Sequence, residues 1–377
     1  MVTMNKKWMM SIVSIFISLV VLSSAIAVGV LAKKQFHLNN QRQTVMAKET
    51  IPKATNKKMY KEIDQMLKKN HFNGNVYVLY KNKEIMNQAY GYASPDHSKR
   101  LTKDSMYLIG SSNKMLTGML IKQLELDGKI NVNDPVKKYI PNFPYVTIRI
   151  KDLLLHQSGL QPFKAREAGP GLDGAVKKII ENGVNPKNYG KFVYRDVNYI
   201  LLAKVIENVT HQPYEVVLQN NVFKPLHLNQ SGFFDNPNFK RYFVTGLKYS
   251  NNQWIYDPAQ FLDRFYGAGN VYMSSKDIGQ FANQFIHGKL FNPVVMQQIL
   301  SNDFTEQAYR YGFYKKPGYY RMRGYFFDTD SVCWFNRNVV VVLNNNKLKP
   351  SEIKNNENLL GKIFKKVEKN MNQKAYQ

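Results

Sequence analysis

The segment Tyr107-Leu108-Ile109-Gly110-Ser111-Ser112-Asn113-Lys114 carries the strongest chemical signal in the chain. It places the Ser111 hydroxyl and the Lys114 amine three residues apart, at the start of an apolar pattern that predicts a helix over 112–127. One helical turn brings both side chains to the same face. A serine becomes nucleophilic when a neighbouring base takes its proton, and a helix N-terminus supplies N–H groups for the resulting oxyanion. The segment therefore predicts Ser111 as a nucleophile and Lys114 as its base.

The spacing alone is weak evidence, because Ser351-Glu352-Ile353-Lys354 repeats it. Ser351 follows Pro350 at the start of a polar helical segment, which is a typical place for an N-cap residue. We therefore interpret the second copy as structural. The first copy also carries a condition, because a lysine acts as a base only if burial or nearby cations lower its pKa.

Patterns on both sides of the nucleophile indicate the fold class. The predicted elements are helices over 58–69 and 197–209, strands over 75–80, 84–90, 325–327, 331–335 and 339–343, a hairpin over 247–256, and a basic amphipathic helix from about Ser351. The middle of the chain, about 128–265, mixes helices with long loops. Strands at both ends with helices between them predict an α+β fold, in which an antiparallel sheet is flanked by helices and carries an inserted all-helical lobe.

Six motifs occur in an order that is similar to one enzyme family. They are Asn73-Gly74-Asn75-Val76-Tyr77-Val78, Tyr90-Gly91-Tyr92-Ala93, the segment 107–114, Leu153-Leu154-Leu155-His156-Gln157-Ser158-Gly159-Leu160, Tyr194-Arg195-Asp196-Val197-Asn198-Tyr199-Ile200-Leu201-Leu202, and Gly267-Ala268-Gly269-Asn270-Val271-Tyr272-Met273-Ser274. Over about residues 58–345 the chain resembles the β-lactamase-related serine hydrolases, which include penicillin-binding proteins, D-alanyl-D-alanine carboxypeptidases, class C β-lactamases and esterase relatives. The resemblance implies a β-lactamase/transpeptidase-like fold, a site in the cleft between sheet and helical lobe, and an acyl-enzyme on Ser111. It implies no metal or organic cofactor.

The family's second motif, Tyr-x-Asn on the loop entering a helix, has two candidates here. Tyr194 precedes the apolar helix predicted over 197–209, whereas Tyr249-Ser250-Asn251 fits the letters better but lies in the predicted hairpin. We place the motif at Tyr194, whose phenolate would share proton transfer with Lys114.

Asp196 stands where this family motif has asparagine. One interpretation is an N-cap for the helix that follows. The other is a counter-ion for a substrate ammonium, which a D-alanyl ester carries and an internal D-alanine of a peptide lacks. In having aspartate at this position, the chain resembles FmtA-type enzymes, which remove D-alanine esters from teichoic acids. Both interpretations of Asp196 are compatible with this resemblance.

The family's third motif, Lys-Thr-Gly or His-x-Gly on a strand lining the pocket, has no recognisable copy. The best-placed stretch is Tyr320-Arg321-Met322-Arg323-Gly324-Tyr325. Arg321 or Arg323 either replaces the basic residue that holds a substrate carboxylate or is a surface arginine, and we include Gly324 among the substrate-binding candidates. We interpret His156 as a structural residue that pins a loop near the site.

The N-terminal region indicates a membrane anchor. Residues 8–32 are almost wholly apolar or small and lack charge. This run is long enough for a helix that spans a membrane. A signal peptide has a shorter apolar region, although Ala25-Ile26-Ala27 resembles a cleavage site and leaves removal open. We predict a short cytoplasmic N-terminus over 1–7, a transmembrane anchor over 8–32, a basic linker over 33–56 and a hydrolase domain over 57–377 on the extracellular, cell-wall side.

Charge and composition narrow the partners. The formal net charge of +26 favours a polyanionic environment, and the membrane segment favours lipid and wall phosphate polymers over nucleic acid. Cys333 is the single cysteine, so no intrachain disulfide forms, and the histidines lack metal-binding spacing. We predict a cell-envelope serine hydrolase that acts on D-alanyl groups of teichoic acid or of peptidoglycan, with the teichoic acid ester preferred. The alternatives are a β-lactamase or low-affinity penicillin-binding protein, and a non-catalytic wall-binding sensor.

Overall fold

The computed structural model describes residues 53–301 and 304–372. The predicted membrane segment and residues 33–52 of the predicted linker lie outside these ranges, and within them no helix is long and apolar enough to cross a membrane. The chain divides into two compact units, Met1–Lys57 and Lys58–Gln377. The first described element, α2, spans Lys53–Lys69 and so includes the end of the predicted linker.

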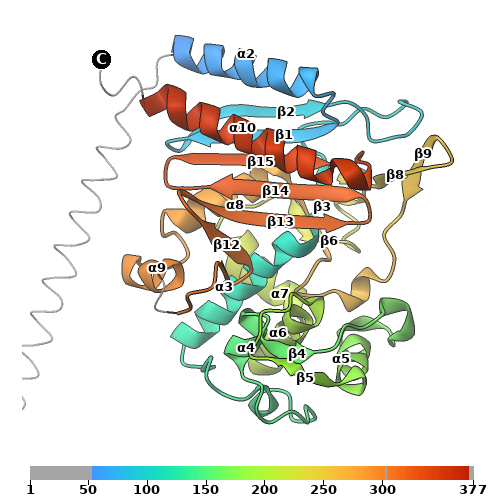
Figure 1. The fold of residues 1–377 in the computed structure, drawn as a ribbon, viewed down its shortest axis with the longest axis vertical. Helices are drawn as coiled ribbons and strands as arrows, with labels where there is room; N and C mark the ends of the chain where they lie inside the picture. The colour runs from blue at the N-terminus through green and yellow to red at the C-terminus, as the bar shows by residue number, and fades with distance from the viewer. Residues whose placement is uncertain (1–52, 302–303, 373–377) are drawn as a thin grey trace, which may run out of the picture. The chain divides into compact units, whose positions relative to one another are not determined.

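A seven-stranded antiparallel sheet forms the centre of the second unit, with the strand order β11-β12-β13-β14-β15-β1-β2 (Figure 1). Its strands are β1 (Gly74–Tyr80), β2 (Lys83–Tyr90), β11 (Tyr309–Arg310), β12 (Phe313–Lys316), β13 (Tyr319–Phe326), β14 (Thr329–Phe335) and β15 (Val339–Asn345). The adjacent pair β1 and β15 joins the two ends of the chain, with Gly74 opposite Asn345. The predicted sheet assembled from both termini is therefore confirmed.

The hairpins follow from their turn residues. Lys81 and Asn82 connect β1 to β2, and Asn251 and Asn252 connect β8 (Gly246–Ser250) to β9 (Gln253–Asp257). All four turn residues have positive φ, which is the backbone twist that two-residue hairpin turns require and that asparagine tolerates. The hairpin predicted over 247–256 is thus confirmed.

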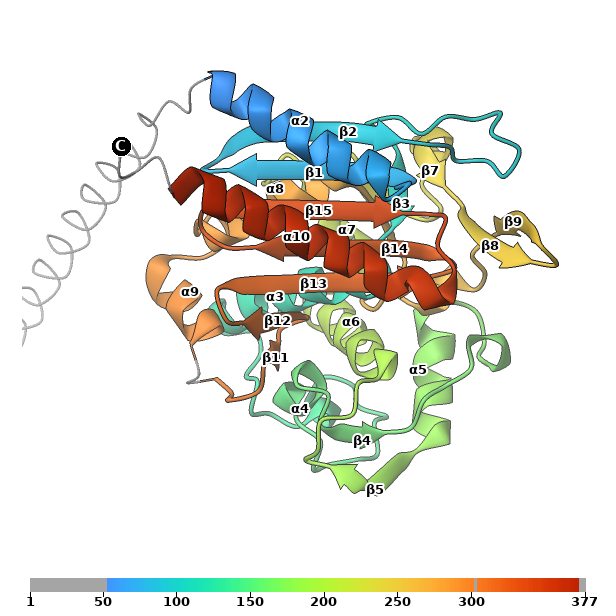
Figure 2. The same cartoon turned by 45° about the horizontal axis from the view of Figure 1, so that its top comes forward.

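Helices cover both faces of the sheet. Helix α10 (Ile353–Asn372) and α2 lie side by side across one face, over β13–β15 and over β1–β2 (Figures 1 and 2). Met59, Ile63 and Leu67, the predicted apolar stripe of α2, are buried. On the other face lies α8 (Ser275–Ile286), whose Gly279 approaches the sheet so closely that an added Cβ would lie 2.3 Å from the Tyr77 ring.

A helical region lies beyond the β11–β13 edge of the central sheet (Figure 2), and the same region of the chain contributes to a second, small sheet. Its elements include α3 (Asn113–Leu126), α4 (Ile150–Leu154), α5 (Gly171–Asn182), α6 (Asp196–Thr210) and α7 (Tyr214–Leu218), with β4 (Ser158–Leu160) paired to β5 (Val184–Tyr189). The small sheet has the order β6-β10-β3-β7, from β3 (Met106–Leu108), β6 (Ser231–Phe233), β7 (Phe243–Val244) and β10 (Val271–Ser274). Helix α9 spans Pro293–Leu300. The predicted α+β class with a helical insert is confirmed.

Strand β13 is longer than the sequence predicts. The predicted strand covers 325–327, but the structure extends it from Tyr319 to Phe326. Arg321 and Arg323 hide the pattern because they look like exposed residues, whereas they lie under α10. Alternation along the strand then places Met322 and Gly324 on the opposite face.

Candidate active site

Ser111, the predicted nucleophile, lies between β3 and α3. After β3, Gly110 adopts φ +49° and a 3-10 turn over Gly110–Ser112 leads into the helix. A side chain at Gly110 would meet Phe326 at 3.1 Å, so both the backbone angle and the space favour glycine. Ser111 is partly exposed while Lys114, one turn later, has a completely buried side chain.

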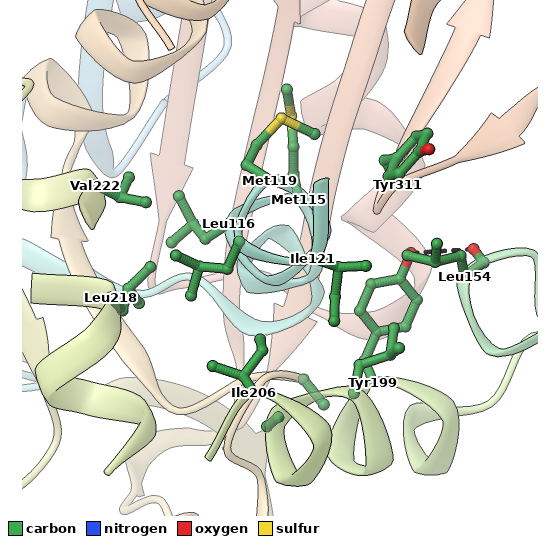
Figure 3. Close-up of a cluster of buried hydrophobic side chains, with 14 of the residues drawn as sticks. Met115, Leu116, Met119, Ile121, Leu154, Tyr199, Ile206, Leu218, Val222 and Tyr311 are labelled. Atoms are coloured by element: carbon green, nitrogen blue, oxygen red, sulfur yellow. Dashed lines mark hydrogen bonds between the residues drawn. The ribbon is translucent and has the colours of Figure 1, made fainter. Parts of the chain in front are cut away.

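Helix α3, which carries Lys114 and directly follows the turn with Ser111, is fixed by packing (Figure 3). Met115, Leu116 and Met119 lie in the core together with residues of α6, α7 and the segment after α7. Gly118 lies against the backbone of Tyr311, since an added Cβ would be 2.4 Å from its carbonyl oxygen. A helix packed on several sides holds its first turn in one place, and with it Lys114 and the adjoining turn that carries Ser111.

Lys114 Nζ donates three hydrogen bonds. Its acceptors are Ser111 Oγ at 2.9 Å, Asp196 Oδ1 at 2.6 Å and the Ala268 carbonyl oxygen at 3.1 Å. The Tyr194 ring centroid lies 5.1 Å from the same nitrogen. The structure thus brings together Ser111, Lys114, Tyr194 and Asp196, all four named from the sequence.

The environment of Lys114 favours its ammonium form. Burial alone would lower the Lys114 pKa, but the charge of Asp196, the neighbouring Tyr194 and hydrogen bonds to both outweigh it and leave the pKa raised. Because the sequence argument required a lowered pKa, the resting site does not meet its condition. A weaker contact with Asp196, or a higher pH, would favour the neutral amine that a general base requires.

Asp196 is the first residue of α6, and the N-cap position belongs to Arg195. The N-cap interpretation of Asp196 is therefore wrong, because its carboxylate is engaged with Lys114 rather than with the helix N–H groups. Its side chain is 42% exposed, in contrast to the buried Lys114. A carboxylate that contacts the predicted base and still faces solvent can also receive a cation from a substrate.

His156 holds the loop that precedes α6. Its Nδ1 lies 3.3 Å from the Arg195 backbone N–H and 2.9 Å from Asn198 Nδ2, and its ring centroid is 4.3 Å from that of Tyr194. Burial, with a smaller effect of the Lys114 charge, lowers the His156 pKa well below its usual value, so the ring is neutral. These contacts agree with the structural interpretation of His156.

Two residues at the site were not singled out from the sequence. Asn198 bonds both to His156 and to the Ser158 hydroxyl, which ties α6 to β4. The Ala268 carbonyl holds Lys114, and its only sequence signal is its place in the motif Gly267-Ala268-Gly269-Asn270. A backbone acceptor leaves no side-chain trace, which is why sequence reasoning missed it.

Arg321 and Arg323 point away from the nucleophile. Both guanidinium groups pair with Glu357 of α10, Arg323 at 2.6 Å, and Arg323 also pairs with Asp330 at 3.0 Å. This geometry does not support the expectation that either arginine holds a substrate carboxylate. On the face of β13 that carries Gly324, the preceding side chain is Met322, which is buried and uncharged.

Gly324 lies directly against the backbone of Ile109–Ser111. A Cβ added there would be 1.9 Å from the Ile109 carbonyl oxygen and 2.6 Å from the Ser111 nitrogen. The glycine thus allows β13 to approach the Ser111 amide, which is the group expected to hold an oxyanion. Its contribution is space for the backbone rather than a side-chain contact with substrate.

The rival motifs lie elsewhere. Ser351 is exposed within a 3-10 turn over Pro350–Glu352 whose N-cap is Lys349, so Ser351 itself is not the cap. Tyr249 lies on β8, where Lys349 Nζ stands 4.2 Å from its ring centroid. In residues 53–301 and 304–372 we find no group of three or more His, Cys, Asp or Glu side chains able to hold a metal ion.

A family model, a characterised relative and a solved structure all match this chain. The beta-lactamase family model matches residues 60–361. Teichoic acid D-alanine hydrolase of Staphylococcus aureus is 39% identical over 319 residues, which cover 83% of this chain and 80% of that protein. The crystal structure of FmtA from Staphylococcus aureus superposes with a TM-score of 0.78 at 39% identity and covers 82% of this chain and 86% of that one.

A more distant structure shares the fold alone. A penicillin-binding protein from Bacillus halodurans has a TM-score of 0.67 at 18% identity, with 77% of this chain and 96% of that one covered. The resemblance drawn from the six motifs is confirmed, and with it the β-lactamase/transpeptidase-like fold. The chain belongs to the beta-lactamase family of serine hydrolases.

Proposed function

We propose that this protein removes D-alanine from teichoic acids by hydrolysing the D-alanyl ester through an acyl-enzyme on Ser111. The observation that carries the proposal is the Asp196 carboxylate, which lies 2.6 Å from Lys114 and keeps 42% of its side chain exposed. It offers a negative charge beside the nucleophile, where the free ammonium of a D-alanyl ester can bind. The name of the 39% identical relative, teichoic acid D-alanine hydrolase, supports the same substrate.

The other wall of the site supports an ester over a peptide that ends in a carboxylate. Arg321 and Arg323 are engaged with Glu357 and Asp330, and Met322 occupies the site-facing position before Gly324. A carboxylate bound there would lose water without gaining a charged partner, which is costly. The same reasoning disfavours penicillins, which carry a carboxylate.

The substrate itself activates the base in this proposal. When its ammonium shares Asp196, the carboxylate holds Lys114 less firmly, and a second cation nearby disfavours the charged lysine. Lys114 then releases one proton through Asp196 to solvent and accepts the Ser111 hydroxyl proton, with Tyr194 sharing the transfer. Ser111 Oγ attacks the ester carbonyl, the Ser111 amide beside Gly324 stabilises the oxyanion, and the polymer hydroxyl leaves with a proton. Water then attacks the acyl-enzyme and releases D-alanine.

We also propose that residues 8–32 anchor the protein in the cytoplasmic membrane, with the catalytic domain on the cell-wall side. The uncharged apolar stretch and the net charge of +26 support this location. Teichoic acids are polyphosphates, so their charge would concentrate such a basic protein on its substrate.

The test compares two D-alanyl donors with the full chain purified in detergent. One is D-alanylated lipoteichoic acid, and the other is a pentapeptide that ends in D-alanyl-D-alanine. Mass spectrometry measures free D-alanine, with Ser111→Ala as the inactive variant and Ser351→Ala, in the second copy of the motif, as the matched control. Release from the teichoic acid alone is expected. Release from the peptide alone would make the protein a carboxypeptidase, and release from neither would favour the non-catalytic sensor.

A further inference from the structure

A large cavity lies outside the serine site. Its volume is about 860 Å³. It opens between the end of α2, the turn that follows β2, the β8–β9 hairpin and the start of α10. We name it the basic cavity and define it by six of its lining residues, Lys68, Tyr92, Trp254, Lys347, Asn355 and Lys362. None of the proposed catalytic residues lines it.

Lys347 is the central cation of the basic cavity. Its Nζ lies 3.3 Å from His97 Nε2 and 5.3 Å from the centroid of the Trp254 ring, and its side chain is half-buried. Among the described residues no carboxylate lies within 4.0 Å of it, in contrast to Lys68, which pairs with Asp64. A desolvated cation held by an imidazole and an aromatic face lacks a counter-charge that an anionic ligand can supply.

The rest of the lining adds positive charge and hydrogen-bonding groups. Asn355, Asn358 and Lys362 occupy one face of α10 at helical spacing and are exposed. The carboxylate in the lining, Glu352, accepts the Lys349 backbone N–H and so caps the turn that leads into the helix. Ammonium groups suit phosphates, while carboxamides and aromatic faces suit hydroxyl-bearing carbon chains.

The basic cavity and Ser111 lie at the same end of the central sheet. Gly324, which contacts the Ser111 backbone, is opposite Ser331, and Ser331 is opposite Asn344. The next residue, Asn345, lines the cavity and points to the other face. Because one strand separates β13 from β15, the two positions are about 10 Å apart across the sheet. A polymer that passes over this end of the sheet can occupy both.

We propose that the basic cavity is a second binding site for a phosphodiester-linked polyol chain, which it holds while an ester on the same chain reacts at Ser111. The coupling to Ser111 rests on the proposed function, whereas the binding itself does not. The positive charge of the cavity is complementary to the phosphates of such a chain. The aromatic and carboxamide groups of the lining favour its polyol part, so we expect the cavity to prefer this chain over a simple polyanion.

Direct binding tests the site without the hydrolytic reaction. The full chain carrying Ser111→Ala is titrated with poly(glycerol phosphate) that bears no D-alanine, at fixed ionic strength, with polyglutamate as the comparison polymer. Lys347→Ala and Lys362→Glu should each weaken poly(glycerol phosphate) binding roughly tenfold, the loss expected for one charge-assisted contact. Lys365→Glu is the matched control, since Lys365 is an exposed residue of α10 outside the cavity lining. It should leave binding unchanged.

Kinetics of the active protein test the coupling. On D-alanylated polymer, Lys347→Ala should raise KM and leave kcat unchanged, and on a D-alanyl ester of glycerol it should change neither. Equal sensitivity of binding to Lys362→Glu and Lys365→Glu, or equal affinity for polyglutamate, would overturn the site, because net charge alone would then explain binding. Binding that depends on Lys347 in a protein that releases no D-alanine would leave the site standing and remove the esterase function instead.

Discussion

Replacement of Asp196 by asparagine separates the two effects of its carboxylate. In the wild type it raises the Lys114 pKa, and in the proposed function its exposed side binds the substrate ammonium. Asp196→Asn removes both effects and keeps the side-chain size. We therefore expect opposite outcomes for two esters that differ only in charge, a D-alanyl ester and its N-acetyl-D-alanyl analogue.

The magnitude follows from exposure. A hydrogen bond to a charged group contributes about 1.5–3 kcal/mol, and we take the lower end because 42% of the Asp196 side chain is exposed. Since about 1.4 kcal/mol corresponds to a tenfold change in rate, kcat/KM for the D-alanyl ester should fall about tenfold. For the N-acetyl ester it should rise at neutral pH, because Lys114 without its carboxylate partner loses its proton more readily.

The assay is the pH dependence of kcat/KM for both esters. With a raised Lys114 pKa, the wild type should gain activity on the N-acetyl ester as pH rises into the alkaline range, because the neutral amine is the base. In Asp196→Asn that rise should move to lower pH. Asp173→Asn is the control, because Asp173 also pairs with a lysine, Lys204, at 2.6 Å but is 83% exposed. Equal loss for both esters would refute the reasoning and reduce Asp196 to a residue that positions Lys114.

Three further perturbations test other parts of the structure. Gly324→Ala should lower kcat roughly 100-fold by displacing the Ser111 amide, in the range for a lost oxyanion donor, and a melting curve near that of the wild type would separate this from unfolding. Glu357→Gln tests the Arg321 and Arg323 pairs. Although burial opposes it, hydrogen bonding and charge from Arg321, with the charge of Arg323, lower the Glu357 pKa from 4.5 to about 2. The lowered pKa stabilises the folded protein by about 3 kcal/mol above about pH 4.5, at 1.36 kcal/mol per pKa unit, and this contribution is lost as pH falls towards 2. Urea unfolding should therefore show the wild type to be more stable than Glu357→Gln at pH 6 and about equally stable at pH 2. A stability difference that does not shrink at low pH would contradict this explanation. A fluorescent penicillin should acylate Ser111 slowly in the wild type and faster in the Asp196→Asn variant, as measured by labelling over time. A rapid stoichiometric burst in the wild type would instead favour the penicillin-binding alternative.

The sequence predicted the parts of the site that depend on local spacing. Ser111, in the 3-10 turn, and Lys114, in the first turn of the adjoining α3, are three residues apart, so their contact follows from local helical spacing. Tyr194 was located by the apolar helix that follows it, and α6 begins at Asp196 as that argument requires. Hairpin turns carried their own signal in paired residues able to adopt positive φ.

The errors concern contacts between segments that are distant in sequence. The Lys114–Asp196 ion pair joins residues 82 positions apart, and no periodicity indicates it. Arg321 and Arg323 were read for charge, whereas their partner Glu357 comes from a helix that packs on the other face of β13. Charge shows that a residue needs a partner but not which face of the strand provides it. The N-cap interpretation of Asp196 failed in the same way, because a long-range partner replaced the local one.

The Lys114–Asp196 pair links activation to substrate choice. In the free enzyme the carboxylate favours the charged form of Lys114, which opposes general base catalysis, so we expect slow reaction with an ester that leaves this contact intact. In the proposed mechanism, a substrate that brings its own cation weakens the contact, so the binding energy of its ammonium is used to free the base. Selectivity then arises from the resting state as well as from attraction, since an uncharged or anionic ester meets a protonated lysine. Asp196, the residue that departs from the family's Tyr-x-Asn motif, would therefore give the enzyme the proposed preference for a D-alanyl ester.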